Sequence, residues 1–463
     1  MADGRWPLPW SLLLSLLFLF SSCAETDLQP VPTPPPLSFK ELKEKVSRIR
    51  GLPFQHEVTL ETKSTEEIQA LLEKSLFEEH SNESLAQVAR VYTRLGLLPE
   101  ATDLSKALVD LHLFQQGVHY DSLRKKIILP QEPLKPYLAF LRSPWSANSI
   151  TKQLLLTHAL THALQEQHFH WEEKIKDRDT EDRGLALRAL AKGDAVLVGL
   201  AHLMGDPNEN KQKILDGIQG LIRLAAQIDE ELPHLPELLR QKAAFQYLQG
   251  SQFVMWAYSL KGWEGVNRLF AHPPISTEQL LHPEKYYEKR DDPVRITPWG
   301  LIRQLGRQKI MDETLGEFLI RILLRNTLSE EEAAQAAAGW AGDSLLAFQQ
   351  GEELILGWVT AWDDREEALE FYRGYRRALE ERYEIFLEPT PASATTLITA
   401  LQSDHPLLLQ IRGNFVFFLD GIPSPQSVEI AEGLWKELET GTESLPVLFD
   451  LVSHPRQPFF VMR

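Results

Sequence analysis

Apolar side chains recur at every third or fourth position through most of the first 260 residues, a spacing typical of amphipathic helices. The segments that this spacing predicts to be helical are 40–115, 147–171, 183–205, 208–230 and 235–260. Ser64 and Glu67 fit a capping box within the first of them. The period changes at residues 117–130, where two apolar runs around a polar turn predict a pair of short strands.

The second part of the chain mixes both periods. Residues 262–300 are rich in Pro, His and Gly, which predicts an ordered loop with short helices. After it, the pattern predicts a helix at 314–326, two strands with a turn near Gly351, a charged helix at 364–384 and a hairpin around Gly413. The fold class predicted from these elements is α+β, predominantly α-helical.

The N-terminus has the pattern of an export signal. The apolar run from Leu12 to Phe20 is too short to span a bilayer but has the length of a signal-peptide core. Ser21, Ser22 and Cys23 follow, and this arrangement resembles a bacterial lipobox. We therefore expect a signal peptide at 1–22, lipid on Cys23 and a Pro-rich tether over 23–38. A plain export signal is the alternative.

Composition narrows the classes of function. The 463 residues carry a net charge of −17 without a long basic cluster, which disfavours nucleic acid and anionic lipid headgroups as partners. Cys23 is the sole cysteine, so an intrachain disulfide is excluded and, once it is lipidated, so is a cysteine nucleophile. The sequence contains neither a Gly-rich phosphate loop nor a G-x-S-x-G motif.

Candidate chemistry lies in the segment LLLTHALTHALQEQHFHW, residues 154–171. His158 and His162 are four positions apart, so a helix places both imidazoles on one face, as two ligands of one zinc ion require. Glu166 lies one turn further along that face. Two histidines at this spacing also occur by chance, so the pair alone identifies no function.

The surrounding sequence resembles a known family. The segment H-A-L-T-H-A-L-Q-E-Q-H-F resembles the H-E-x-x-H helix of gluzincin zinc metallopeptidases, especially exported bacterial proteins that have HELTHALQDQHF there. Residues 186–198 and 273–287 are similar to two further segments of that group, and the likeness extends over about residues 40–420. The resemblance implies a zincin-like domain with paired active-site helices at 39–290 and a smaller α+β region at 291–463.

The chain departs from this family at the positions of the catalytic base and the third zinc ligand. Ala159 occupies the position of the glutamate that acts as general base, and a methyl group transfers no proton. Lys192 occupies the position of the third zinc ligand, and an ammonium group has no lone pair to donate. We therefore expect no cofactor and propose that the Lys192 ammonium fills the space of the metal. Zinc held by His158 and His162, with Glu166 as a further ligand, is the alternative.

The resulting prediction is an inactive metallopeptidase homologue, a pseudopeptidase that is lipid-anchored to a bacterial membrane with its body in the periplasm or at the cell surface. It would act as a binding or scaffold protein, with a polypeptide in the former substrate cleft. His282 and Glu284, which follow the Ser276–Gln279 capping box, are candidate binding residues. Two alternatives stay open: an active zinc peptidase with an unusual ligand set, and a structural envelope lipoprotein with a vestigial cleft.

Overall fold

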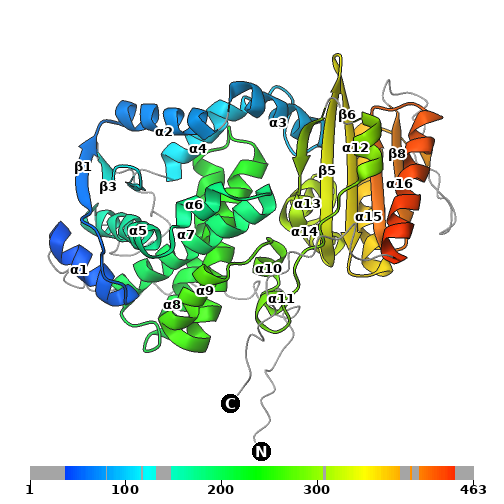
Figure 1. The fold of residues 1–463 in the computed structure, drawn as a ribbon. Helices are drawn as coiled ribbons and strands as arrows, with labels where there is room; N and C mark the ends of the chain where they lie inside the picture. The colour runs from blue at the N-terminus through cyan, green and yellow to red at the C-terminus, as the bar shows by residue number, and fades with distance from the viewer. Residues whose placement is uncertain are drawn as a thin grey trace, which may run out of the picture. The chain divides into compact units, whose positions relative to one another are not determined.

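The computed structural model describes residues 37–79, 81–115, 118–131, 148–305, 309–385, 397–398 and 406–443. From Leu37 onward they belong to one compact unit of α+β type in which helix predominates, as the periodicity predicts (Figure 1). The predicted signal peptide and Cys23 lie outside these ranges, and the predicted boundary after residue 290 falls inside the unit. Within the described ranges, no helix has both the length and the apolar character needed to cross a membrane.

Long helices form the first part of the chain. They are α1 (Phe39–Arg50), α2 (Thr65–Glu79), α3 (Asn82–Leu95), α4 (Leu104–Gln115), α5 (Asn148–Phe169), α6 (Trp171–Lys176), α7 (Glu181–Met204), α8 (Lys211–Glu231) and α9 (Glu237–Ala271). The predicted helices from residue 147 to 260 are confirmed to within a few residues, except at the end of the last one. The loop predicted from residue 262 begins ten residues later, because the helical path of α9 resumes after a break at Lys261 and Gly262.

A small sheet packs beside α5. Its strands are β1 (Thr59–Lys63), β2 (His119–Asp121) and β3 (Lys126–Pro130), in the order β1-β3-β2. β2 and β3 form the predicted hairpin, whereas the prediction of helix throughout 40–115 is wrong at β1. Parallel pairing with β3 and the ion pair between Glu61 and Lys126 hold this segment extended, so tertiary contacts override local propensity. The capping box of Ser64 and Glu67 is confirmed by two hydrogen bonds of 2.9 and 3.2 Å.

The remaining elements surround a larger antiparallel sheet. Its strands are β4 (Lys309–Glu313), β5 (Trp340–Gln350), β6 (Glu353–Trp362), β7 (Leu397–Ile398), β8 (Leu407–Arg412) and β9 (Phe415–Asp420), in the order β4-β5-β6-β9-β8-β7. The helices of this part are α10 (Glu278–Leu281), α11 (Glu284–Tyr287), α12 (Trp299–Leu305), α13 (Gly316–Arg325), α14 (Glu330–Ala337), α15 (Arg365–Tyr383) and α16 (Gln426–Glu443). The helix at 314–326, the charged helix and both predicted strand pairs are confirmed.

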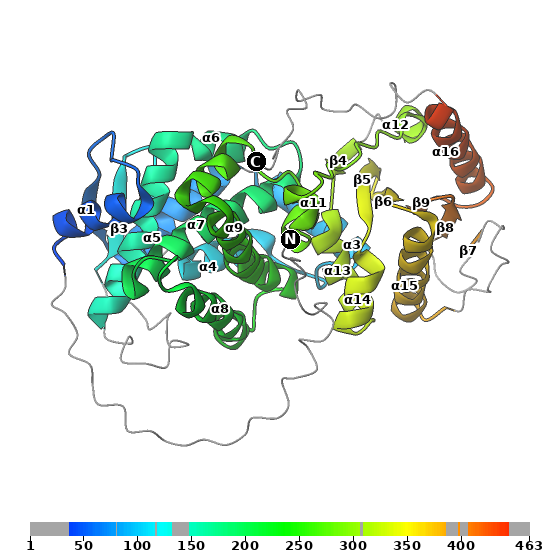
Figure 2. The same ribbon diagram turned by 90° about the horizontal axis from the view of Figure 1, so that it is seen from below.

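Both faces of this sheet are covered by helices. Figure 2 shows α15 and α16 on opposite sides of it. Leu346 packs in a cluster with residues of α12 and α16, while its neighbour Leu345 packs in the cluster that includes α13, α14 and α15. Because successive side chains of a strand point to opposite faces, two covered faces explain why β6 and β9 are buried at almost every position.

A close backbone contact joins α7 to α9. A methyl group on Gly193 would lie 2.1 Å from the carbonyl oxygen of Gly250, and one on Gly250 would lie 2.0 Å from the carbonyl oxygen of Ala189. Only glycine leaves room for such an approach. The contact brings Lys192, next to Gly193 on α7, beside Tyr247 on α9.

Candidate functional site

Two imidazole rings lie in contact on α5. The ring centroids of His158 and His162 are 4.7 Å apart, and their Nε2 atoms are separated by 3.1 Å, the distance of a hydrogen bond. Both side chains are half-buried. The spacing of four places them on one helical face, so each ring presents the same nitrogen to one point.

The side chain of Gln165 sets the hydrogen positions of this pair. Its Nε2 donates to the carbonyl oxygen of Ala191 at 3.0 Å and to Oδ2 of Asp194 at 2.9 Å. The amide oxygen is thereby turned toward Nδ1 of His162, 2.8 Å away, and can only accept. His162 therefore carries its proton on Nδ1, and its Nε2 accepts the hydrogen bond that His158 Nε2–H donates.

Asp194 continues this chain of hydrogen bonds into the protein core. It is fully buried and forms an ion pair of 2.9 Å with Nε of Arg50, of which only 1% is exposed. The guanidinium also donates to Oδ1 of Asn267 at 2.7 Å and lies 4.8 Å from the ring centroid of Trp263. Helices α1, α5, α7 and α9 thus all contribute to one buried polar network that ends at the imidazole pair.

Lys192 lies near the pair, over the ring of Tyr247. Its Nζ is 5.6 Å from the centre of the Tyr247 ring, which in turn lies 6.1 Å from the ring of His158. Lys192 and Tyr247 are half-buried, as the two histidines are. The two Nε2 atoms bond each other, and the ammonium lies over the tyrosine ring; no hydrogen bond between Lys192 and either imidazole is described.

Burial favours the uncharged forms of the two imidazoles and of Lys192. It lowers the pKa of His162 to about 3, with the Lys192 charge adding to the effect, and lowers the pKa of His158 well below its usual value. Burial also lowers the pKa of Lys192 to about 8. At neutral pH the site therefore combines two neutral imidazoles with one ammonium.

We expect acid to destabilise the protein through the histidine pair. The unfolded rings take up protons near pH 6.5 whereas the folded His162 stays neutral to about pH 3, so lowering the pH through this window favours unfolding. After allowance for partial exposure, the loss from pH 7 to pH 4.5 is on the order of 2 kcal/mol. Urea unfolding at both pH values should show this loss in the native chain and a smaller one in His158→Gln/His162→Gln. An equal loss in both would contradict the expectation.

The other candidate positions on α5 do not complete a metal site. Ala159 is fully buried, packed in the apolar cluster between α5 and the small sheet. The Glu166 carboxylate accepts a 2.9 Å hydrogen bond from the backbone N–H of Glu172 at the start of α6. His168 Nε2 lies 2.7 Å from the carbonyl oxygen of Pro53, away from the pair.

The geometry of the pair alone is compatible with a metal, but the full residue set does not fit catalytic zinc. Two nitrogens on one tetrahedral zinc lie roughly 3.3 Å apart, given Zn–N bonds of about 2.0–2.1 Å, close to the 3.1 Å between the Nε2 atoms. The position at which the metallopeptidase resemblance would place a third ligand, however, is Lys192, whose cation would repel a metal and adds to the lowering of the pKa of both rings by burial. The position at which it would place a general base is Ala159.

His282 and Glu284 belong to a different part of the structure. His282 Nε2 lies 2.8 Å from Oε1 of the buried Glu317 on α13, and its Nδ1 lies 3.8 Å from Oε1 of Glu284. Burial opposes protonation of His282, but the bond to Glu317 and the nearby carboxylates outweigh it and raise the pKa. No contact described in the structure joins these residues to the pair on α5.

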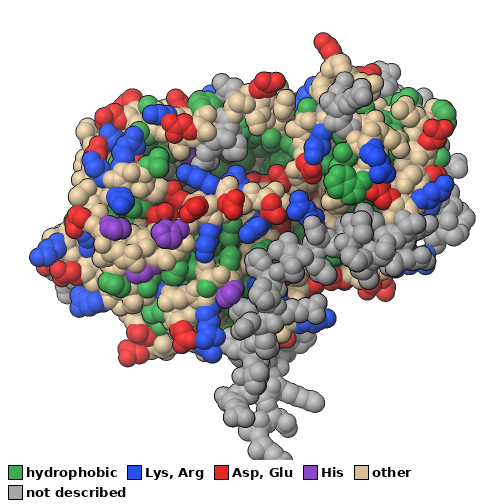
Figure 3. Space-filling view, in the orientation of Figure 1, with side chains coloured by type: hydrophobic (Ala, Val, Ile, Leu, Met, Phe, Trp, Pro, Cys, Tyr) green, Lys and Arg blue, Asp and Glu red, His purple; other side chains and the backbone are tan. Residues whose placement is uncertain are grey.

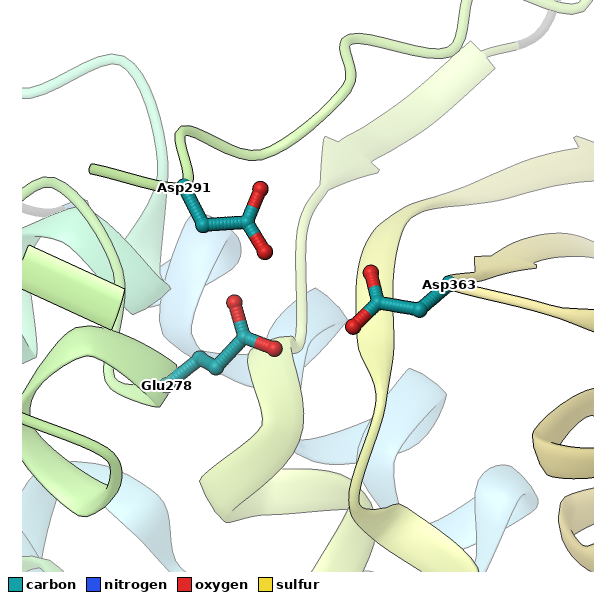
Figure 4. A group of neighbouring side chains, drawn as sticks. All are labelled: Glu278, Asp291 and Asp363. Carbon is teal, nitrogen blue, oxygen red and sulfur yellow. The ribbon is translucent and has the colours of Figure 1, made fainter. Parts of the chain in front are cut away.

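Three carboxylates converge near this second group (Figure 4). Glu278, Asp291 and Asp363 each place an oxygen within 4.8 Å of the others. The ammonium of Lys285 contacts all three, at 2.6, 3.3 and 2.6 Å. The lysine thus offsets part of the negative charge of the cluster, and it ties the 273–292 segment to the end of β6. Sequence reasoning missed the cluster because its members lie up to 85 residues apart.

The molecular surface carries charges of both signs on the face shown in Figure 3. On the face drawn in Figure 3, acidic and basic side chains are interspersed. The net charge of −17 is therefore not gathered into one large acidic area on this face.

Comparison with known proteins bears on the C-terminal part. Residues 303–429 match the model of a family described as "Domain of unknown function (DUF8575)". This range contains β4 to β9 and the start of α16, and excludes the helices that carry the histidine pair. The chain has no significant match among curated proteins or among solved structures. The class that fold and site define is thus an α+β, mainly helical protein with a half-buried histidine pair.

Proposed function

We propose that this chain is a metallopeptidase-like protein without peptidase activity, exported, held at a bacterial membrane by lipid on Cys23, and acting by binding a polypeptide at the former catalytic site. The observation that carries the proposal is the closed pair of His158 and His162. Their Nε2 atoms satisfy each other, and a cation lies where a third, anionic ligand would be needed.

The arrangement supports binding over hydrolysis for two reasons. Water activation by zinc needs both a metal and a carboxylate base in contact with the bound water. Ala159 supplies no carboxylate and is sealed in the core, and Glu166 is engaged at the start of α6. The network from Arg50 to His162 remains hydrogen-bonded, so the scaffold of the site is retained without its reactive groups.

Lys192→Glu tests this proposal. The change replaces the cation with a carboxylate next to two imidazoles, so the affinity for zinc should rise at least about tenfold over the native chain, measured by competition with a chelating dye. Adding Ala159→Glu should keep that affinity at a cost in stability, because the new side chain enters a fully buried site. Lys174→Glu, which changes the charge of a half-buried lysine on α6, is the control and should leave zinc affinity unchanged. A native chain that already binds one zinc as tightly as Lys192→Glu would contradict the proposal.

A further inference from the structure

The Lys192 ammonium has no anionic partner among the residues that the structure describes. The carboxylates on its own helix and on α5 are bound elsewhere. Asp194 pairs with Arg50 and Gln165, and Glu166 accepts from the backbone of Glu172. Glu181 pairs with Lys242 and Arg188, and Asp182 accepts hydrogen bonds from Thr277. A lysine that is half removed from water without a counter-charge is unfavourable. An incoming anion would relieve that cost.

The groups around this ammonium are only partly buried. Lys192, Tyr247, His158 and His162 each retain some accessible surface. The ammonium lies 5.6 Å from the centre of the Tyr247 ring, and that ring lies 6.1 Å from the ring of His158. The neighbours are neutral rings, so they neither compete for the ammonium nor repel an anion.

We propose that Lys192 binds a carboxylate, carried by a polypeptide, at the surface that it shares with Tyr247 and the histidine pair. This inference rests on the proposed function and specifies its ligand. An ammonium–carboxylate contact in a partly desolvated site forms a charge-assisted hydrogen bond, which is stronger than a neutral one. The carboxylate would occupy the side of the pair where a metalloenzyme holds its metal and substrate.

The test uses titration calorimetry on the full chain with three peptides. They are acetyl-trialanine with a free C-terminal carboxylate, the same peptide amidated, and an amidated peptide with one aspartate. Binding of the free acid at least tenfold tighter than its amide supports a C-terminal carboxylate, and tighter binding of the aspartate peptide supports an acidic side chain. Lys192→Met should abolish the preference in either case.

Lys174→Met is the matched control. Lys174 also lies over an aromatic ring, 5.5 Å from Trp171, but donates to the carbonyl oxygen of Phe270, so its loss should leave the preference unchanged. Equal affinity for acid and amide, absence of binding by all three peptides, or an undiminished preference in Lys192→Met would overturn the carboxylate assignment. Cleavage of a peptide during the titration would instead overturn the proposed function, so the two failures are distinguishable.

Discussion

Asp194→Ala should lower the free energy of unfolding by about 3–5 kcal/mol, because it leaves a buried guanidinium without its counter-charge. Arg50 is 1% exposed and Asp194 is fully buried, so water cannot replace the lost carboxylate. The same substitution removes one acceptor of Gln165 and frees its amide to turn, which loosens the constraint on His162. Urea unfolding followed by circular dichroism measures the loss.

Two further variants make this expectation specific. Asp216→Ala on α8 removes an exposed carboxylate that accepts from Gln212, and it should change stability by less than about 0.5 kcal/mol. The double variant Arg50→Met/Asp194→Ala should recover a large part of the loss, since a buried ion pair can be exchanged for apolar groups at little cost. A single variant as stable as the native chain would show that the network does not hold these helices together.

Gly193→Ala should also destabilise strongly, by about 3 kcal/mol, although alanine is the better helix former. The added methyl group would lie 2.1 Å from the carbonyl oxygen of Gly250, and this neighbour is backbone that can yield only if α7 and α9 separate. The separation would also move Lys192 away from Tyr247. Thermal and urea unfolding should both report the change.

Gly220→Ala provides a control of opposite sign. Gly220 lies on α8, and no described atom outside its own helical turn lies within 4 Å of the position of the added methyl group. Helix propensity therefore decides the effect, and stability should rise by about 0.5–1 kcal/mol. The same chemical change therefore has contrary effects on two helices. If both variants gain stability, the close approach of α7 and α9 is refuted.

Most of the fold could be predicted from the sequence because its elements are long and strongly periodic. The helices between residues 147 and 260 and the strands on either side of Gly351 belong to this class. The strand at Thr59–Lys63 could not be predicted, since its state depends on pairing with Lys126–Pro130, more than sixty residues away. This strand has only five residues and is followed by a helix, so it is too short to show a strand periodicity of its own.

The sequence predicted which residues of α5 and α7 matter at the site, but not the hydrogen bonds and contacts that they make with other helices. The spacing of His158 and His162 follows from helix geometry alone. The link from Gln165 through Asp194 to Arg50 joins residues up to 144 positions apart, and no spacing rule relates them. The place of Tyr247 beside Lys192 depends on two glycines meeting on different helices, which pattern reasoning does not reach.

The central claim is tested most directly by elemental analysis of the full chain, purified without added metal or chelator. The same preparation is assayed for cleavage of a generic protein substrate. The claim predicts far less than one zinc per chain and no cleavage, whether or not zinc or chelator is then added. One zinc per chain together with chelator-sensitive cleavage that His158→Ala abolishes would contradict it.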